Sequence, residues 1–151
     1  SVLSESEIIT EIERYLPCRF VVLTGGEPSL QITEEFIDSL ISRGYFVAIE
    51  TNGTLPLPKN ISWVTCSPKF EFCENAEVRL NHIDELKVIF CGNNQAIDEY
   101  SAIPARYRHL QPCDTGAPAR NRQLMTDAIS YVKAHPEWRL SIQLHKILNI
   151  P

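Results

Sequence analysis

With 151 residues, the chain has the length of one domain and enough material to build a hydrophobic core. Its 44% hydrophobic and 22% charged content is close to the average of globular proteins, and no apolar run approaches the ~18 residues of a membrane span. The formal net charge of -5, without a basic stripe, argues against a nucleic-acid surface. We therefore expect a soluble, cytoplasmic protein with no membrane and no nucleic acid as direct partner.

The cysteines are odd in number and irregular in spacing, which favours reduced thiols over a disulfide framework. No Cys-x-x-Cys pattern occurs, so the spacing typical of zinc and iron–sulfur sites is missing. The five are Cys18, Cys66, Cys73, Cys91 and Cys113.

Helical and apolar strand-like segments alternate along the chain. Ser4 and Glu7 form a capping-box pattern that predicts a helix up to Leu16, and the short apolar run 20–23 predicts a buried strand. Thr33 begins a second helix, which ends before Gly44. The further predicted strands are 45–49, 61–64, 84–90, 107–110 and 140–144. The further predicted helices are 95–102 and 119–134. The segment 70–81 is interpreted as a loop or one short helix.

This order predicts an α/β fold in which about six strands form a mostly parallel sheet within a single domain, 1–151. Ligands of such sheets bind outside the carboxyl ends of the strands. Polar residues follow four of the predicted strands, at Thr24 to Glu27, Glu50, Ser67 to Lys69 and Gln111 to Asp114.

The first of these ends, Thr24-Gly25-Gly26-Glu27-Pro28, is the most specific. Two glycines permit positive φ and a close approach of a ligand to the backbone, while Pro28 stiffens the turn. A Gly-Gly pair alone fits a plain strand-to-helix turn equally well. At the next strand end, Glu50 can accept hydrogen bonds from a ribose diol, although the Asn52-Gly53 pair after it also fits a simple loop.

Lys87 lies among apolar neighbours in a predicted strand, where an ammonium needs a partner. Two interpretations stay open. Lys87 pairs internally, with Glu50 or Glu85, or it faces a ligand carboxylate.

The Thr-Gly-Gly-Glu-Pro string resembles the turn after the second barrel strand of the radical S-adenosylmethionine enzymes. In that superfamily the turn holds the methionyl amine of the cofactor with backbone carbonyls and the carboxylate. An ammonium requires acceptors, and bare glycine backbone offers carbonyls that no Cβ shields.

Six strings in order extend the resemblance over essentially the whole chain, and together they are similar to the 7-carboxy-7-deazaguanine synthases. They are Thr-Gly-Gly-Glu-Pro-Ser, Glu-Thr-Asn-Gly, Cys-Ser-Pro-Lys, Glu-Leu-Lys, Leu-Gln-Pro-Cys-Asp and His-Lys-Ile-Leu-Asn-Ile-Pro. The resemblance implies a partial (β/α) barrel of the radical S-adenosylmethionine type, commonly a homodimer. It also implies conversion of 6-carboxytetrahydropterin to 7-carboxy-7-deazaguanine with loss of ammonia, on the route to queuosine.

The same resemblance implies a [4Fe-4S] cluster, Mg²⁺ and S-adenosylmethionine as cofactors, and a pterin as substrate. It assigns no residue of this chain a catalytic or metal-binding role. The implied cofactor contacts are Gly25, Gly26, Glu27, Glu50, Ser67, Pro68, Lys69, Gln111, Pro112, Cys113 and Asp114, and the implied substrate contacts are Thr24, His145 and the carboxylate of Pro151.

The chain departs from the family pattern in one respect, because the strand and loop that carry three cluster cysteines have no counterpart in it. We therefore expect these residues to be the C-terminal portion of a radical S-adenosylmethionine core, inactive alone. Two other functions stay open. A glycyl-radical activating enzyme would share the glycine turn but not the His-Lys ending, and a non-catalytic nucleotide-binding module would have no cysteine-rich loop upstream.

Overall fold

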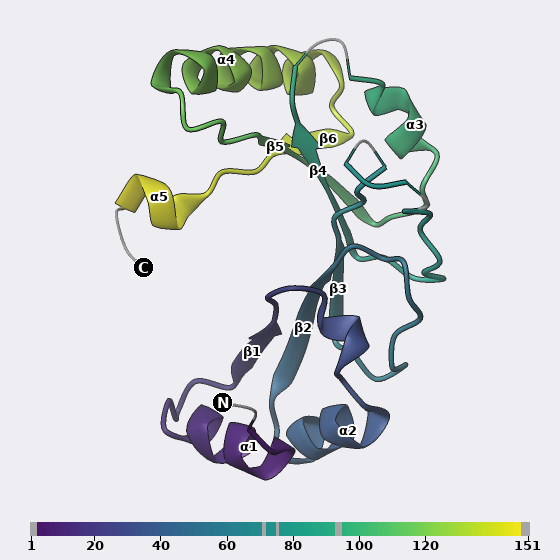
Figure 1. Cartoon of the computed structure of the whole chain (residues 1–151), viewed down its shortest axis with the longest axis vertical. Coiled ribbons are helices and arrows are strands. Elements are labelled where there is room, and N and C mark those ends of the chain that lie inside the picture. The colour runs from purple at the N-terminus through teal and green to yellow at the C-terminus, as the bar shows by residue number, and fades with distance from the viewer. Residues whose placement is uncertain (1–2, 71, 75, 93–94, 149–151) are drawn as a thin grey trace. The chain divides into compact units, whose positions relative to one another are not determined.

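The computed structural model describes residues 3–70, 72–74, 76–92 and 95–148. Its strands form a six-stranded sheet in the order β1-β2-β3-β4-β5-β6 (Figure 1), which confirms the α/β prediction. The chain divides into two compact units, Ser1–Thr65 with Lys69–Asn81, and Cys66–Pro68 with His82–Pro151. The single domain stays a prediction.

The first unit carries two helices and the first strands of the sheet. Its elements are α1 (Glu5–Glu13), β1 (Phe20–Leu23), the 3-10 helix η1 (Pro28–Leu30), α2 (Glu34–Ser42), β2 (Phe46–Thr51) and β3 (Trp63–Cys66), whose last residue belongs to the second unit. The second unit contains β4 (Glu85–Phe90), α3 (Ile97–Ser101), β5 (Tyr107–Pro112), α4 (Pro118–Ala134), β6 (Trp138–Leu140) and α5 (Leu144–Leu148).

The first helix begins at the cap that the sequence predicts, and the second begins at Thr33. The Ser4 N–H donates to Glu7 Oε2 at 2.8 Å and the Glu7 N–H donates to Ser4 Oγ at 3.4 Å, so the capping box is confirmed. The hydroxyl oxygen of Thr33 accepts from the Phe36 N–H at 3.1 Å at the start of α2. Gly44, with φ of 80°, follows the end of that helix.

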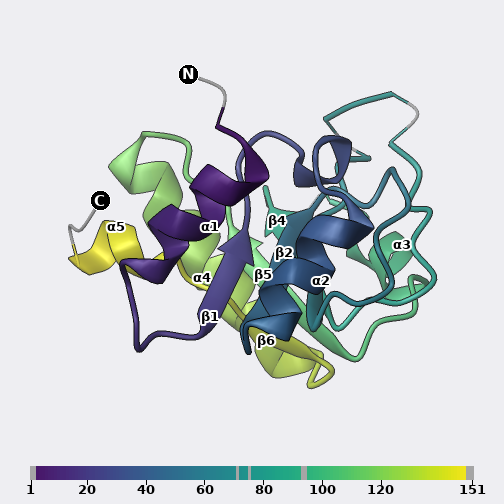
Figure 2. The same cartoon turned by 90° about the horizontal axis from the view of Figure 1, so that it is seen from below.

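The core of the first unit lies between these helices and one face of the strands. β1 and β2 pair in parallel, and α1 and α2 lie next to them in both views (Figures 1 and 2). Ile37, Leu40 and Val47 are completely buried in this cluster, and Val21 and Leu23 pack against it. Apolar burial of this kind stabilises the unit by about 25 cal/mol per Å².

The prediction that 20–23 is a buried strand is wrong. β1 forms at the expected residues, but the side chains of Phe20 and Val22 are 56% and 44% exposed. Among the described strands β1 stands first in the sheet order, and its alternate residues Val21 and Leu23 pack against the cluster that includes residues of α1 and α2. On the other face Phe20 stacks on Phe46 with ring centroids 5.4 Å apart. A short apolar run thus predicts a strand, but it does not predict that both faces of the strand are buried.

The second unit packs α4 against its three parallel strands. In β4 alternate residues are buried, which places Leu86, Val88 and Phe90 on the covered face. Leu124 and Ala128 are the fully buried residues of α4. Glu85, Lys87 and Ile89 lie on the opposite face of β4 from these core residues, because side chains alternate along a strand.

Two strand predictions need correction. β3 runs from Trp63 rather than from residue 61, and Cys66 is its last residue, buried, rather than the first after it. The predicted strand 140–144 is wrong, since β6 ends at Leu140 and α5 begins at Leu144. Ile142 and Leu144 are 40% and 57% exposed, so among the described residues their alternation does not mark a buried strand face. None of the described helices combines the length and the apolar character that crossing a membrane requires.

Candidate functional site

The glycine turn after β1 adopts the backbone that its sequence predicts. Gly25 and Gly26 have φ of 87° and 39°, which L side chains rarely adopt. A Cβ built on either glycine meets no atom within 4 Å, and both residues are exposed. Open space therefore borders the backbone of this turn, so a ligand can reach the main chain there.

Glu27 joins this turn to the end of β2. One carboxylate oxygen accepts from the Thr51 hydroxyl at 2.6 Å, and the other accepts from the Asn52 N–H at 2.8 Å. The first oxygen also accepts from the Ser29 hydroxyl at 2.7 Å and from the Ser29 N–H at 3.1 Å. The acidic group of the turn is thus hydrogen-bonded to two segments that are far apart in the chain.

These bonds also set the charge state of Glu27. Its partial burial by itself raises the pKa, but the hydrogen bonds from the Asn52 N–H, the Thr51 hydroxyl and Ser29 outweigh burial and hold the pKa below its ordinary value. Glu27 is therefore ionised at neutral pH.

The second strand end is ordered by its own hydrogen bonds. The Thr51 hydroxyl accepts from the Gly53 N–H at 3.1 Å, and the Asn52 side-chain oxygen accepts from the Thr54 N–H at 2.8 Å. Glu50 lies at an exposed position of β2, one residue before the buried Thr51. The sequence analysis missed Thr51, although its place directly after Glu50 in the Glu-Thr-Asn-Gly string is a signal that could have pointed to it.

The turn after β5 contains the other large group of predicted contacts. Gln111 and Pro112 are the last residues of β5, and the Cys113 N–H donates to the Phe90 carbonyl at 2.9 Å. Asp114 accepts from the Gly116 N–H at 3.0 Å and from the Asn121 side chain at 2.7 Å.

Asp114 also binds the ammonium of Lys146 in α5. This hydrogen bond is the largest cause that holds the pKa of Asp114 well below its usual range, followed by the bonds from Gly116 and Asn121. The pair connects the turn after β5 to the C-terminal helix.

The remaining predicted residues are distributed over both units. Ser67 is half-buried and Pro68 buried at the end of β3, while the Lys69 carbonyl accepts from the N–H groups of Phe72 and Cys73 at 2.9 Å each. His145 lies in α5, and the predicted Pro151 lies outside the described residues. The first unit brings Thr24 to Glu27 next to the residues that follow Glu50, and convergence with the turn after β5 stays a prediction.

Lys87 has an internal partner, as one of the two interpretations predicts. Its ammonium lies 3.8 Å from Glu85 Oε1, and His109 Nδ1 lies 3.5 Å from the same oxygen. Burial lowers the pKa of His109, and the charges of Arg139 and Lys87 add to this effect while Glu85 opposes it. His109 is therefore neutral at pH 7.

No group of three or more His, Cys, Asp or Glu in the described part of the chain is placed to hold a metal ion. The five cysteines are free thiols, of which Cys18 and Cys73 are exposed and Cys66 is buried. The described residues therefore do not fit a [4Fe-4S] cluster or a Mg²⁺ site.

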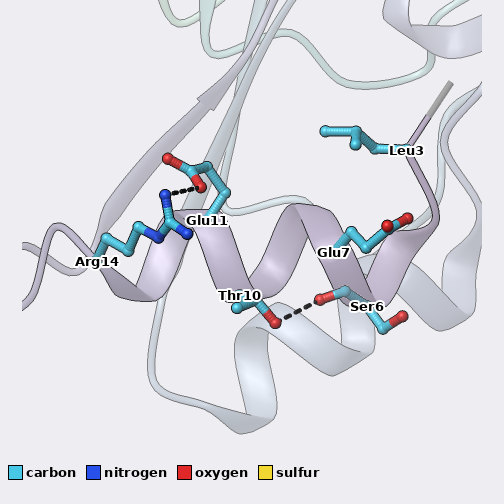
Figure 3. Close-up of a pocket in the computed structure, with 6 residues that line it drawn as sticks. All are labelled: Leu3, Ser6, Glu7, Thr10, Glu11 and Arg14. Atoms are coloured by element: carbon cyan, nitrogen blue, oxygen red, sulfur yellow. Dashed lines mark hydrogen bonds and ion pairs between the residues drawn. The ribbon is translucent and has the colours of Figure 1, made fainter. Parts of the chain in front are cut away.

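A groove on α1 contains none of the predicted contacts among its lining residues (Figure 3). It is lined by Leu3, Ser6, Glu7, Thr10, Glu11 and Arg14. Its polar groups satisfy one another, since the Thr10 hydroxyl donates to the Ser6 carbonyl at 2.9 Å and Arg14 lies 2.7 Å from Glu11. We interpret it as the solvated face of a helix.

Comparisons with known proteins show which family the chain belongs to. No protein-family model matches the chain. Over 150 residues it is 44% identical to the 7-carboxy-7-deazaguanine synthase of Bacteroides thetaiotaomicron, and the match covers 99% of this chain and 75% of the relative. The chain belongs to the 7-carboxy-7-deazaguanine synthase family.

Other members of the 7-carboxy-7-deazaguanine synthase family support the assignment. The synthase of Burkholderia multivorans is 43% identical over 133 residues, where the chain spans 60% of the relative's length. The crystal structure of QueE from Escherichia coli matches with a TM-score of 0.69 at 29% identity, covering 93% of this chain and 64% of that one. The chain thus spans about three fifths to three quarters of these relatives.

Proposed function

We propose that the protein that contains this chain is a 7-carboxy-7-deazaguanine synthase. It is a radical S-adenosylmethionine lyase that converts 6-carboxytetrahydropterin to 7-carboxy-7-deazaguanine with loss of ammonia, in queuosine biosynthesis. The observation that carries the proposal is the 44% identity over 99% of the chain to a relative that bears this name.

The glycine turn supports the cofactor assignment independently of identity. Gly25 and Gly26 leave their backbone open, as binding of the cofactor's methionyl ammonium by carbonyl oxygens requires. S-adenosylmethionine supplies, when bound, the source of the radical. We assign its contacts to the residues that the resemblance names: Gly25 to Glu27, Glu50, Ser67 to Lys69, and Gln111 to Asp114.

The pterin contacts in this proposal are Thr24, His145 and Pro151. Thr24 is exposed directly before the glycine turn, so its side chain is accessible to a substrate beside the cofactor. In the proposed full-length enzyme, the [4Fe-4S] cluster and Mg²⁺ are held by residues other than those described, and we derive no step through either. We further propose a homodimer in the cytoplasm.

The full-length protein provides the test. It is purified without oxygen and supplied with iron, sulfide, Mg²⁺ and a reductant. With 6-carboxytetrahydropterin and S-adenosylmethionine it should then form 7-carboxy-7-deazaguanine, which mass spectrometry detects. Product that depends on the iron and sulfide, on Mg²⁺ and on the reductant supports the proposal. A protein that binds a full cluster and cleaves S-adenosylmethionine, but leaves the pterin unchanged, contradicts the substrate assignment and favours another radical enzyme such as an activase.

A further inference from the structure

Two cysteines follow neighbouring strands of the second unit. Cys91 comes directly after β4 and Cys113 directly after β5, and both side chains are half-buried. The two strands pair in parallel with Phe90 opposite Pro112 (Figure 1), so the next position on each strand is a cysteine. The Cys113 N–H donates to the Phe90 carbonyl at 2.9 Å, which carries the pairing one residue past the end of β5. Cys91 and Cys113 are therefore neighbours across the sheet.

The spacing of their backbones suits a disulfide. Neighbouring strands lie about 4.8 Å apart, and the Cα atoms of disulfide-bonded cysteines lie about 4.4 to 6.8 Å apart. The Phe90 carbonyl belongs to the same peptide group as the Cys91 nitrogen, so its bond to the Cys113 N–H alone keeps the two Cα atoms within roughly 7 Å. A disulfide also needs Cβ atoms about 3.5 to 4.5 Å apart, so closing it draws the two segments slightly together.

The backbone of Cys91 is held more firmly than the segment after Cys113. The Cys91 N–H donates to Gln95 Oε1 at 2.9 Å, and the Cys91 carbonyl accepts from Arg120 Nη2 at 3.0 Å. Residues 114–120, in contrast, are exposed. Closing a disulfide therefore moves the turn after β5 toward Cys91.

Access to a soluble oxidant distinguishes this pair within its unit. The second unit contains one further cysteine, Cys66, which is completely buried and therefore shielded from such an oxidant. In a reducing compartment, protein disulfides are mostly transient and serve catalysis or redox sensing. Two half-buried thiols at neighbouring strand ends fit a reversible disulfide.

We infer that Cys91 and Cys113 form a redox pair, which a low-molecular-weight disulfide such as oxidised glutathione converts to an intramolecular disulfide. The thiolate of one cysteine attacks a sulfur of oxidised glutathione, forms a mixed disulfide and releases one glutathione thiolate. The thiolate of the other cysteine attacks the protein sulfur of the mixed disulfide and releases the second glutathione thiolate. The two protons of the protein thiols pass to the released thiolates, so the protein loses two electrons and glutathione gains them.

The disulfide also changes a proposed cofactor contact. Cys113 lies in the turn after β5, residues 111–114, which the proposed function assigns to S-adenosylmethionine. Because the disulfide moves this turn toward Cys91, the oxidised protein binds S-adenosylmethionine more weakly than the reduced protein. This consequence rests on the proposed function, whereas the pairing of the two thiols rests on the geometry of the sheet.

Peptide mapping of the full-length protein tests the pair. The protein is equilibrated without oxygen in mixtures of oxidised and reduced glutathione, the remaining thiols are blocked with N-ethylmaleimide, and the protein is digested with trypsin. Cleavage after lysine and arginine places Cys91 in the peptide 88–106 and Cys113 in the peptide 109–120. We expect these two peptides to be joined, in an amount that rises with the share of oxidised glutathione and disappears with dithiothreitol.

Two variants and the wild type decide whether the pair exists. Cys91→Ser removes a thiol outside the proposed cofactor contacts and should abolish the joined peptides. Cys18→Ser is the matched control, because it removes an exposed thiol of the first unit, and should leave the joined peptides unchanged. Wild-type protein without joined peptides at a large excess of oxidised glutathione overturns the pair, whether or not either cysteine carries glutathione.

Calorimetry of S-adenosylmethionine binding tests the consequence. In the wild type the dissociation constant should rise on the order of tenfold on oxidation and return after dithiothreitol, whereas in Cys91→Ser it should change by less than about twofold. Joined peptides with unchanged affinity overturn the redox control of binding. Reduced wild-type protein that does not bind S-adenosylmethionine overturns the proposed function, and the peptide map then still decides whether the thiols pair.

Discussion

Two acidic residues follow strands of the sheet, and the structure uses them in different ways. Glu27 is part-buried and bound by backbone and hydroxyl donors, two of them from the end of a neighbouring strand. Asp114 is exposed and bound by Gly116 of its own turn, by Asn121 of α4 and by the ammonium of Lys146. The bonds from neutral donors to Glu27 should depend little on salt, whereas the Asp114 arrangement includes an ion pair with Lys146 that salt screens. Two carboxylates with the same predicted role can therefore differ in how strongly salt affects their interactions.

The largest expected effect is the loss of stability in Glu27→Ala. Removing the carboxylate leaves several donors without acceptors, and we expect the free energy of unfolding to fall by about 2 kcal/mol. Asp114→Ala should cost clearly less, because water can replace the lost partners at an exposed site. Trp63 lies in the first unit and Trp138 in the second, so ¹⁹F NMR of fluorotryptophan-labelled protein during urea unfolding reports each unit separately. Equal losses of unfolding free energy in Glu27→Ala and Asp114→Ala would contradict the proposed difference between the two carboxylates.

The variants Gly26→Val and Gly116→Val test whether a ligand binds beside the turn after β1. Gly26 and Gly116 both have positive φ, 39° and 74°, and open space at the Cβ position, so each valine costs about 1 to 2 kcal/mol in backbone strain. Gly26→Val also fills the space beside the proposed cofactor contacts. We expect it to weaken S-adenosylmethionine binding on the order of tenfold or more, by calorimetry on the full-length protein, while Gly116→Val changes affinity by less than about threefold. Equal effects would remove Gly26 from the site.

The pH dependence of the first unit should follow Glu27. Its pKa in the folded protein lies below the ordinary value of 4.5, so the stability that it contributes is complete above about pH 4.5 and is lost as the pH falls through the folded pKa. The free energy of unfolding, measured with urea between about pH 3 and pH 7, should therefore fall toward the acid end of this range. The fall should be smaller in Glu27→Gln. An identical decline in that variant would mean that other carboxylates cause it.

The smallest effect is expected at the exposed ion pair. In Lys146→Met the pKa of Asp114 should move back toward 3.8, since Lys146 is the largest cause of its depression. Hydrogen exchange of α5 should increase, and raising the salt concentration should reproduce part of that change in the wild type. Lys59→Met, at an exposed loop position, is the control and should alter neither. Unchanged exchange in Lys146→Met would show that other contacts hold α5.

The sequence by itself determined most of the local structure. The Ser4 capping box, the strand at Phe20 to Leu23, the helix end at Gly44 and the positive φ of the glycine turn follow from rules that act within a few residues. The family also follows from the sequence, because the six strings keep their order and the relatives align over nearly the whole chain.

Only the tertiary structure decided how these segments are used. Local patterns did not show that Phe20 is exposed among the described residues, nor that Leu140 ends its strand, because burial depends on which element packs against each face. In the same way, the sequence marked Glu27 as an acceptor without showing its partner. Thr51 lies 24 residues away, and the hydrogen bond exists because parallel pairing of β1 with β2 brings the two strand ends together.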